Sequence, residues 1–289
     1  MLYYIIYDIT YRFFENKKEK GWWIDMYPYI EIFNRKITTY GVVSTIGLFV
    51  AAILACYLIK KEENDYYDMI VVLLISSVGL LICSHVLYGI TNIDLLVRVI
   101  SHFDRIKGFS DFVNIFAYIF GGSVFYGGLI GFLITAYICV KKKKLNKKRY
   151  FDIFAVIIPL FHFFGRIGCF LVGCCYGIES KIGFTFRHAM IESANHVHRF
   201  PIQLVEAGFN LILFSVLLTL YKKKKIKGKL IYIYLLSYSV ARFFFEFLRG
   251  DDYRGFLFGL STSQIISILI IIFVGIIIVY KRIKRKIES

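Results

Sequence analysis

Proline and acidic residues are scarce in this sequence. Its 289 residues include three prolines, and 20 Asp and Glu stand against 36 Lys and Arg, while 58 % of the residues are hydrophobic. A soluble domain of this length could not bury so much apolar surface in one core, because polar groups must cover its outside. The composition therefore excludes an ordinary soluble protein and indicates a membrane protein.

Targeting signals and a disulfide framework are also lacking. The first ten residues, MLYYIIYDIT, contain no basic segment, and Asp8 interrupts the apolar run early. The six cysteines lie in or beside apolar runs, which is not typical of a disulfide framework. Since an organelle address is missing too and lysine is abundant, we expect a multi-pass protein of the bacterial cell (cytoplasmic) membrane.

Seven apolar segments approach or exceed the length of about 20 residues that a helix needs to cross a bilayer. They cover residues 38–60, 69–91, 113–140, 151–175, 203–221, 229–249 and 257–280. The third is too long for one span, and its glycines at 121–128 predict an interfacial approach and then a helix from about 122. The sequence thus predicts an all-α polytopic membrane protein with about seven transmembrane helices. We expect an external lead-in at 1–37, one membrane domain at 38–280 and a basic cytoplasmic tail at 281–289.

The formal charge of +16 would suggest nucleic acid as a partner if the protein were soluble. Here the basic residues form clusters between the apolar segments, at 60–61, 141–149, 222–229 and 281–286. Such clusters are typical of cytoplasmic loops beside an anionic leaflet, so we expect membrane lipid as a partner and no nucleic acid. This arrangement puts the N-terminus outside the cell and the C-terminus inside.

The same orientation places costly polar residues of five helices in the outer half of the bilayer. Such side chains normally face a cavity or one another. They are His85, Tyr126, Arg166, Gln203, Glu206, Tyr238, Arg242, Glu246 and Arg249. We therefore expect one polar site near this depth.

The sixth apolar segment has the most regular polar pattern. Tyr238, Arg242 and Glu246 follow at intervals of four residues, and Arg249 comes three later, which puts them on one face of a helix. One interpretation is a structural Arg242–Glu246 pair that ties two helices together. The other is a clamp for phosphate or carboxylate, because the planar guanidinium binds such groups through two parallel hydrogen bonds.

The fourth segment sets Arg166 among glycines, including Gly165 and Gly168. Glycine within a span allows either close helix packing or close approach of a ligand to the backbone. Arg166 is far from the helix end, so its charge is not easily explained by contact with water.

Three cysteines follow Arg166, at 169, 174 and 175. Three thiols without a well-spaced histidine make a poor zinc site, so we interpret them as small packing residues and expect neither a metal nor a cofactor. Four histidines fall in external loops, where a solvated role is expected: His102, His188, His196 and His198. His85 lies in an apolar helix end, and a functional and a structural role are equally plausible there.

Taken together, these residues resemble the phosphatidylglycerol–prolipoprotein diacylglyceryl transferase family. The similarity centres on Gly165-Arg166-Ile167-Gly168-Cys169-Phe170 and on Tyr238, Arg242, Glu246, Phe247 and Arg249. It also includes Tyr40-Gly41, Gly127-Gly128-Leu129-Ile130-Gly131, Arg199 to Leu204 with Glu206, and Ser263 to Ser267. The resemblance spans about residues 25 to 280 and implies seven spans with an external N-terminus.

The resemblance implies transfer of a diacylglyceryl group from phosphatidylglycerol to the lipobox cysteine of a prolipoprotein signal peptide. It assigns phosphate binding to Arg166 and Arg242, a hydrogen bond to Tyr238, orientation of the arginines to Glu246, and proton handling to Tyr126 or His85. The wider set of substrate-binding residues that it implies is Tyr40, Gly127, Gly128, Gly165, Gly168, Gln203, Glu206 and Arg249.

Four positions depart from the family pattern: Tyr126 replaces a histidine, Cys169 an asparagine, Cys174 a glutamate and Ile82 a basic residue of the second span. The anion-binding arginines are kept while the proton-handling position has changed. Two alternatives therefore stay open, a related membrane transferase with a different acceptor and a non-enzymatic protein that binds or transports lipid.

Overall fold

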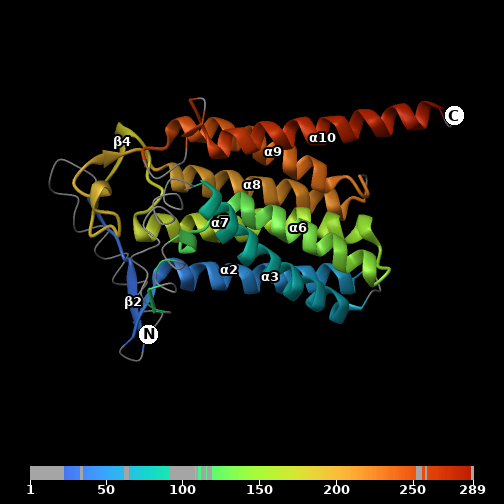
Figure 1. Cartoon of the computed structure of the whole chain (residues 1–289), viewed down its shortest axis with the longest axis horizontal. Coiled ribbons are helices and arrows are strands. Elements are labelled where there is room, and N and C mark those ends of the chain that lie inside the picture. Colours follow the sequence, from blue (N-terminus) through green and yellow to red (C-terminus); the bar gives the residue numbers. More distant parts are fainter. Residues whose placement is uncertain are drawn as a thin grey trace. The chain divides into compact units, whose positions relative to one another are not determined.

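The computed structural model describes residues 23–32, 35–61, 65–91, 108, 110–111, 115, 119–224, 226–251, 256–257 and 259–287. Within these ranges, seven helices are long and apolar enough to cross a membrane, as the sequence predicted. They are α2 (Thr39–Lys60), α3 (Tyr66–Thr91), α6 (Phe125–Lys142), α7 (Lys147–Val172), α8 (Ile202–Lys222), α9 (Leu230–Phe245, continued by the 3-10 turn η4, Glu246–Leu248) and α10 (Thr262–Ile287) (Figure 1). The third span begins at Phe125 rather than near 122, and most of the expected interfacial approach before it lies outside the described residues.

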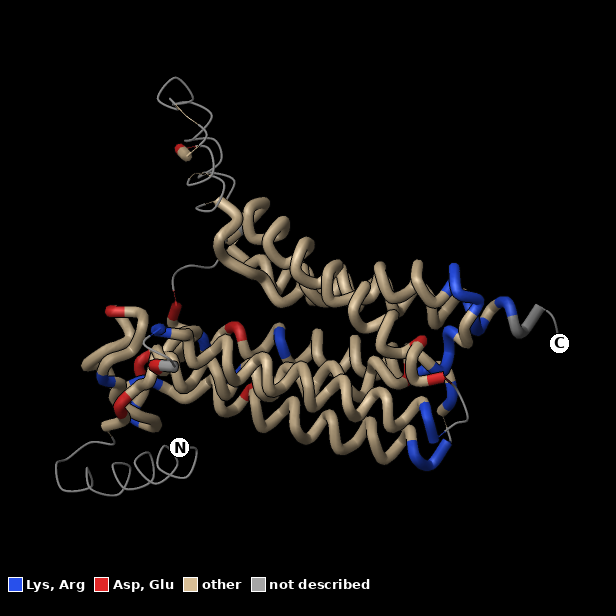
Figure 2. Tube along the Cα trace, turned by 90° about the horizontal axis from the view of Figure 1, so that it is seen from below, with Lys and Arg blue, Asp and Glu red and all other residues tan. Residues whose placement is uncertain are grey.

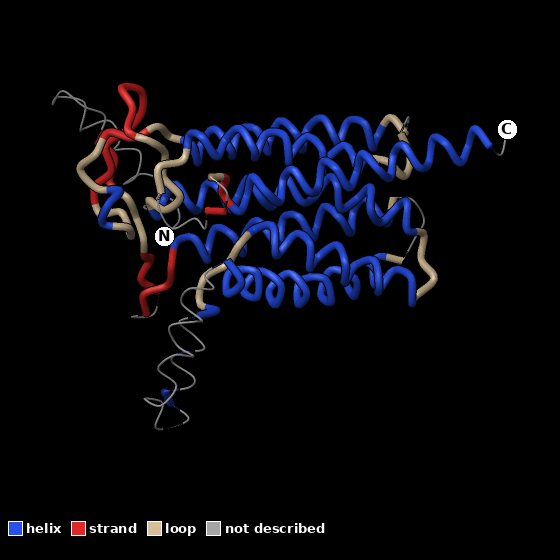
Figure 3. Tube along the Cα trace, turned by 45° about the horizontal axis from the view of Figure 1, so that its top comes forward, coloured by secondary structure: helices blue, strands red, loops and turns tan. Residues whose placement is uncertain are grey.

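Short strands accompany the helices, and the all-α prediction did not include them. β1 (Trp23–Asp25) pairs in parallel with β4 (Glu179–Arg187), which pairs antiparallel with β5 (His198–Arg199). Two hairpins complete the set, β2 (Tyr29–Ile32) with β3 (Arg35–Thr38) and β6 (Phe256–Leu257) with β7 (Leu260–Ser261). Figure 3 shows the strands in red and the long helices in blue. Most are too short for an alternating pattern to be recognised in a sequence.

The chain divides into two compact units, which are described separately. Unit 1 comprises residues Met1–Ala51, Val156–Thr219 and Phe244–Asp252, and unit 2 comprises Ala52–Ala155, Leu220–Phe243 and Tyr253–Ser289. Several helices contribute residues to both units. The boundaries predicted from the sequence, at 37 and 280, remain predictions.

In unit 2, α3 and α6 pack closely through glycines. A Cβ atom at Gly131 would lie 2.2 Å from the Gly79 carbonyl oxygen, and one at Gly127 would lie 2.4 Å from that of Cys83. Real Cβ atoms do not approach oxygen so closely, so only glycine permits this helix contact. Packing thus accounts for Gly127 without a substrate.

The basic clusters lie at helix ends, as expected. The Lys143 ammonium forms an ion pair with Asp68, and Lys281 donates a 2.8 Å hydrogen bond to the Tyr232 hydroxyl. Figure 2 shows groups of Lys and Arg in blue at helix ends, next to long stretches of helix without charged residues. The predicted side of the membrane for these clusters remains a prediction.

One acidic side chain organises a basic loop of unit 2. The Asp152 carboxylate, near the start of α7, accepts hydrogen bonds from the backbone N–H groups of Gly228 and, at 2.9 Å, Leu230. Gly228 has a φ of +74°, which favours glycine. Leu230 is the first residue of α9, so Asp152 fixes the beginning of that helix.

Candidate functional site

Unit 1 contains a buried ion pair between two membrane spans. Nη2 of Arg166 on α7 lies 2.6 Å from Oε2 of Glu206 on α8. The two residues are 6 % and 1 % exposed. Glu206 is one helical turn beyond Gln203, whose amide nitrogen donates a 2.9 Å hydrogen bond to the Cys174 carbonyl. The spacing of three residues therefore brings both polar side chains of α8 toward the end of α7.

The polar cluster around Arg166 has hydrogen-bonding capacity that the described residues do not use. Nε of Arg166 and Oε1 of Gln203 are buried and have no hydrogen-bond partner in the described part of the chain. Leaving such a group unsatisfied costs about 1–3 kcal/mol. Buried polar atoms without a partner in a native structure commonly interact with water or a ligand. A donor on a permanently charged guanidinium suits an anionic ligand.

Gly165 and Gly168, on either side of Arg166, have different surroundings. Outside its own helix, a Cβ at Gly165 would meet no described heavy atom within 4 Å. A Cβ at Gly168 would lie 3.1 Å from Cδ2 and 3.3 Å from Cα of Tyr40 on α2. Gly168 therefore serves helix packing against Tyr40. Gly165 instead leaves open space at its own position on α7.

A second buried arginine of unit 1, Arg199, binds backbone carbonyls and has a structural role. Arg199 donates hydrogen bonds to the carbonyl oxygens of Ala194, Gly177 and Ser193, at 3.4, 3.3 and 2.5 Å. Its guanidinium also lies over the Tyr176 ring, 4.2 Å from the centroid. Arg199 thus holds together the segment between α7 and α8, where Tyr176 belongs to a small apolar core.

Arg249, at the end of η4, pairs with a nearby carboxylate. Its Nε donates a 2.9 Å hydrogen bond to Oδ1 of Asp251, and the two side chains are 8 % and 6 % exposed. Burial alone would lower the pKa of the Arg249 guanidinium, but Cys175 and Asp251 raise that pKa well above its ordinary value. The residue therefore stays charged. Glu246, the first residue of η4, is also buried.

Unit 2 contains a cluster of tyrosine side chains. The Tyr126 hydroxyl at the start of α6 lies 2.6 Å from the Ser267 hydroxyl on α10. The Tyr126 ring meets that of Tyr238 edge to face at 5.7 Å, and Tyr238 stacks on Tyr234 at 5.8 Å. All three tyrosines are buried. Tyr126 and Tyr238, both predicted as catalytic, are therefore neighbours.

Arg242 contacts the first turn of α10. Its Nη2 donates a 3.2 Å hydrogen bond to the Ser263 hydroxyl. That turn is fixed by a capping box: the Gln264 side chain accepts from the Ser261 N–H at 3.0 Å, and the Ser261 hydroxyl accepts from the Gln264 N–H at 3.2 Å. Ser267 lies one turn after Ser263 and donates to its carbonyl at 2.7 Å. The capping box thus positions the serines that contact Arg242 and Tyr126.

The motif Ser-Thr-Ser-Gln at 261–264 is typical of a capping box and could have indicated this helix start. No site role was predicted for Ser263 or Ser267. Serines four residues apart on an apolar helix are also common without a function, because each can donate to the carbonyl one turn earlier. Their importance depends on contacts with helices distant in sequence.

His85 on α3 uses one ring nitrogen for backbone contacts. Its Nδ1 lies 2.7 Å from the carbonyl oxygen of Phe120 and 2.8 Å from that of Gly122. Because carbonyl oxygens only accept, Nδ1 carries the proton, and a neutral His85 has Nε2 as its acceptor. His85 therefore has a structural role in holding the segment before α6.

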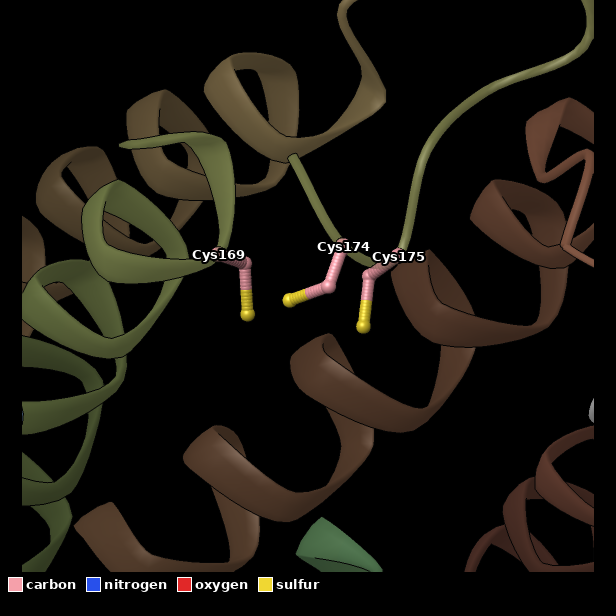
Figure 4. Close-up of side chains that lie close together, drawn as sticks. All are labelled: Cys169, Cys174 and Cys175. Carbon is pink, nitrogen blue, oxygen red and sulfur yellow. The ribbon is translucent and has the colours of Figure 1, made fainter. Parts of the chain in front are cut away.

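The three cysteines near the end of α7 form a cluster. Sulfur atoms of Cys169, Cys174 and Cys175 all lie within 4.8 Å of one another, and Figure 4 shows the thiols directed toward a common space. Hydrogen bonding to the other two thiols, followed by burial, raises the pKa of Cys174 well above its ordinary value. Hydrogen bonding with the same neighbours lowers the pKa of Cys175 despite its burial. From the sequence these cysteines were predicted to be packing residues, and the convergence of their sulfurs was not predicted.

The loop histidines are placed in part. His198 Nδ1 is 2.6 Å from the Ser180 carbonyl oxygen, His196 packs against the Trp23 ring, and His188 lies 3.5 Å from the Asp25 carboxylate. His102 lies outside the described residues. The predicted site residues thus form two groups that we describe apart: Arg166, Gln203, Glu206 and Arg249 in unit 1, and Tyr126, Tyr238 and Arg242 in unit 2.

Similarity to known proteins covers nearly the whole chain. The sequence model of the prolipoprotein diacylglyceryl transferase family matches residues 28–280. The phosphatidylglycerol–prolipoprotein diacylglyceryl transferase of Clostridium tetani (strain Massachusetts / E88) is 34 % identical over 253 residues, which cover 86 % of this chain and 94 % of that protein.

Two further relatives give the same picture. A Clostridium perfringens (strain 13 / Type A) protein with the same name and the suffix 2 is 35 % identical over 260 residues, or 89 % of this chain and 94 % of that protein. The Campylobacter hominis protein of that name is 30 % identical over 260 residues, or 86 % and 90 % of the two chains. The similarity extends from before α2 into α10.

Proposed function

Because the chain belongs to the prolipoprotein diacylglyceryl transferase family, we propose that it transfers a diacylglyceryl group from phosphatidylglycerol to the lipobox cysteine of prolipoproteins. In this reaction a carbon–sulfur bond forms at the glyceryl carbon that carries the phosphate. The carbon–oxygen bond to phosphate breaks, glycerol phosphate leaves, and the thiol proton passes to a base. The observation that carries the proposal in this chain is the buried Arg166, which has an unused donor inside a membrane span.

Arg166 is our candidate for binding the phosphodiester. Glu206 holds the guanidinium through one Nη, and Nε remains available to a phosphate oxygen. A guanidinium held by a carboxylate loses little freedom when it binds an anion, and its attraction to charge is strong where water is excluded. The space beside Gly165 is where we place part of the lipid.

Arg242 is our candidate for stabilising the phosphate as it departs. It lies on α9 one turn after Tyr238, whose hydroxyl we assign a hydrogen bond to a phosphate oxygen. Contact with Ser263 orients the guanidinium. Charge grows on the leaving phosphate in the transition state, so a fixed cation accelerates the step.

Tyr126 is our candidate for handling the proton, with His85 as the competing assignment. An ordinary tyrosine has a pKa near 10 and is a weak base, whereas a cysteine thiol titrates near 8.5. A tyrosine hydroxyl handles such a proton only where a nearby cation favours the phenolate form. His85 is less favoured because Nδ1 already holds two backbone carbonyls, although its Nε2 could accept a proton.

We also propose that the protein lies in the bacterial cytoplasmic membrane with its N-terminus outside. On this arrangement a cysteine introduced at Asn195 reacts with an impermeant thiol reagent in intact cells. A cysteine at Asn146 reacts only after the cells are opened, and the unsubstituted chain supplies the background. Reversed labelling would overturn the orientation.

The deciding experiment for activity uses the purified full chain, labelled phosphatidylglycerol and a lipobox peptide. We expect the peptide to gain the mass of a diacylglyceryl group and labelled glycerol phosphate to appear in equal amount. A peptide with Ser in place of the lipobox cysteine is the control.

Tyr126, Cys169 and Cys174 differ from the family pattern and are the reason for two alternatives: a different acceptor, or lipid binding without a reaction. The same assay tests both alternatives. Consumption of phosphatidylglycerol without a change in peptide mass would indicate a different acceptor. Binding without consumption would indicate a lipid-binding protein and overturn the proposed reaction.

A further inference from the structure

The cysteine cluster of unit 1 is built by a turn at the end of α7. Cys169 lies in the last turns of the helix, and the N–H of Cys174 donates a 3.1 Å hydrogen bond back to its carbonyl oxygen. Gly173 and Cys175 have φ angles of +76° and +53°, so the chain reverses here through two left-handed residues. That conformation is uncommon for a cysteine. The reversal brings all three sulfurs within 4.8 Å of one another (Figure 4).

This spacing fits a metal ion bound by three sulfurs. A metal–sulfur bond of about 2.3 Å in a trigonal arrangement separates the sulfurs by about 4 Å. Cys169 is buried and the other two are half-buried, which leaves an approach to the cluster. The sulfurs therefore need only a small adjustment to bind one ion.

Two cations lie close enough to affect the thiolates. Arg166 interacts electrostatically with Cys169 and Cys175, and Arg249 interacts with Cys175. Each of these arginines also has a carboxylate partner, Glu206 or Asp251. The surroundings thus contain two cations and two anions, and the guanidinium groups offset part of the negative charge that three thiolates bring.

The ligand set distinguishes between classes of metal. Zinc in structural sites takes four tetrahedral ligands, and the described residues bring no fourth His, Cys, Asp or Glu into this group. Three thiolates alone suit a soft ion, and copper(I) is the soft ion that cysteine ligands select in biology. A hard ion such as Mg²⁺ or Ca²⁺ requires oxygen ligands.

We propose that Cys169, Cys174 and Cys175 bind one soft thiophilic ion of the copper(I) class as a three-thiolate site. Binding displaces the thiol protons to solvent and changes no oxidation state. None of the three thiols is assigned a role in the proposed transfer reaction.

The test uses the full chain, purified in detergent under reducing conditions and titrated with copper(I) held by a coloured chelator. We expect one copper per chain, with thiolate-to-metal absorption in the ultraviolet. Cys169→Ser, Cys174→Ser and Cys175→Ser should each weaken binding by about 100-fold or more, since each removes a ligand. Cys56→Ser, a cysteine on α2 outside the cluster, is the matched control and should bind as the native chain does.

X-ray absorption of the copper-loaded native protein gives a measurement that needs no variant. We expect three sulfur neighbours at about 2.3 Å. Equal copper binding by the native chain and all three serine variants would overturn the proposal. Tighter binding of zinc than of copper(I) would also overturn it. Copper stoichiometry does not depend on turnover, so this result and the transfer assay fail or succeed separately.

Discussion

Arg166 and Arg199 are both buried arginines of unit 1, yet their guanidinium groups are used differently. Arg199 donates to three backbone carbonyls and covers a tyrosine ring. Arg166 is held by one carboxylate and keeps a buried Nε without a partner among the described residues. Burial of a charge is thus a weak indicator of a site. Unused hydrogen-bonding capacity separates the arginine that builds the fold from the one suited to a ligand.

The same distinction applies to the two candidates for the base in unit 2. Nδ1 of His85 is occupied by the Phe120 and Gly122 carbonyls, as the Arg199 donors are occupied by theirs. Tyr126 contacts a side-chain hydroxyl, Ser267, which can rotate to suit a changed proton arrangement. By this criterion His85 is the structural residue and Tyr126 the reactive one.

The largest effect is expected at Arg199. Arg199→Ala removes the donors to three backbone carbonyls and should lower the free energy of unfolding by about 3–5 kcal/mol. Thermal unfolding in detergent measures the loss, and the activity of the remaining folded protein should stay close to that of the native chain. Full stability with lost turnover would reverse the roles of the two arginines.

Tyr126 and His85 are expected to show the next largest effects, on different properties. Tyr126→Phe removes only the hydroxyl and should reduce turnover by roughly 10²-fold or more, while the conserved ring volume preserves the fold. His85→Gln should act mainly on stability. Tyr126→His should keep activity and shift its pH optimum downward, because imidazole titrates near 6.5.

Rate profiles against pH on one lipid substrate distinguish the two assignments. A silent Tyr126→Phe together with a severe loss of turnover in His85→Gln would move the proton-handling role to His85. The assignments of Arg166 and Arg242 to phosphate would be unaffected.

A more moderate effect is expected from Arg166→Lys, which keeps the positive charge and loses the planar fork. We expect kcat/KM to fall by about 5- to 150-fold, the equivalent of about 1–3 kcal/mol of transition-state stabilisation. Arg199→Lys is the matched control, and its loss should appear in unfolding temperature instead. Equal kinetic losses in both variants would contradict the distinction between a spare and an occupied guanidinium.

Sequence alone predicted the spans and the chemistry of their polar residues. Apolar length fixed seven helices to within a few residues at most ends, because a bilayer imposes that length. The cost of intramembrane charge identified Arg166, Glu206 and Arg242. Neither argument could distinguish Gly165 from Gly168, or show that three cysteines converge, because those properties depend on the neighbouring backbone.

The strands and the serines of α10 were missed for a related reason. Two- to nine-residue strands are stabilised by partners far away in the sequence, as β1 is by β4. Ser267 belongs to the site only because its hydroxyl contacts that of Tyr126, 141 residues earlier. Periodicity reports which face of an element is apolar, and it does not report which element covers that face.

The smallest effect on stability is expected at Gly165. A substitution there tests whether substrate occupies the open space at this position, next to Arg166 in the sequence. Gly165→Ala adds a methyl group that meets nothing within 4 Å outside its helix, and alanine favours a helix by about 1 kcal/mol over glycine. The unfolding temperature should therefore stay or rise slightly. If lipid occupies that space, kcat/KM falls several-fold through a higher KM, because the methyl group displaces substrate. Gly168→Ala is the control: its methyl group meets Tyr40 at 3.1 Å, so it should lower stability by about 1–2 kcal/mol through overpacking. Unchanged kinetics in Gly165→Ala would place the lipid elsewhere and leave the spare Arg166 donor facing water.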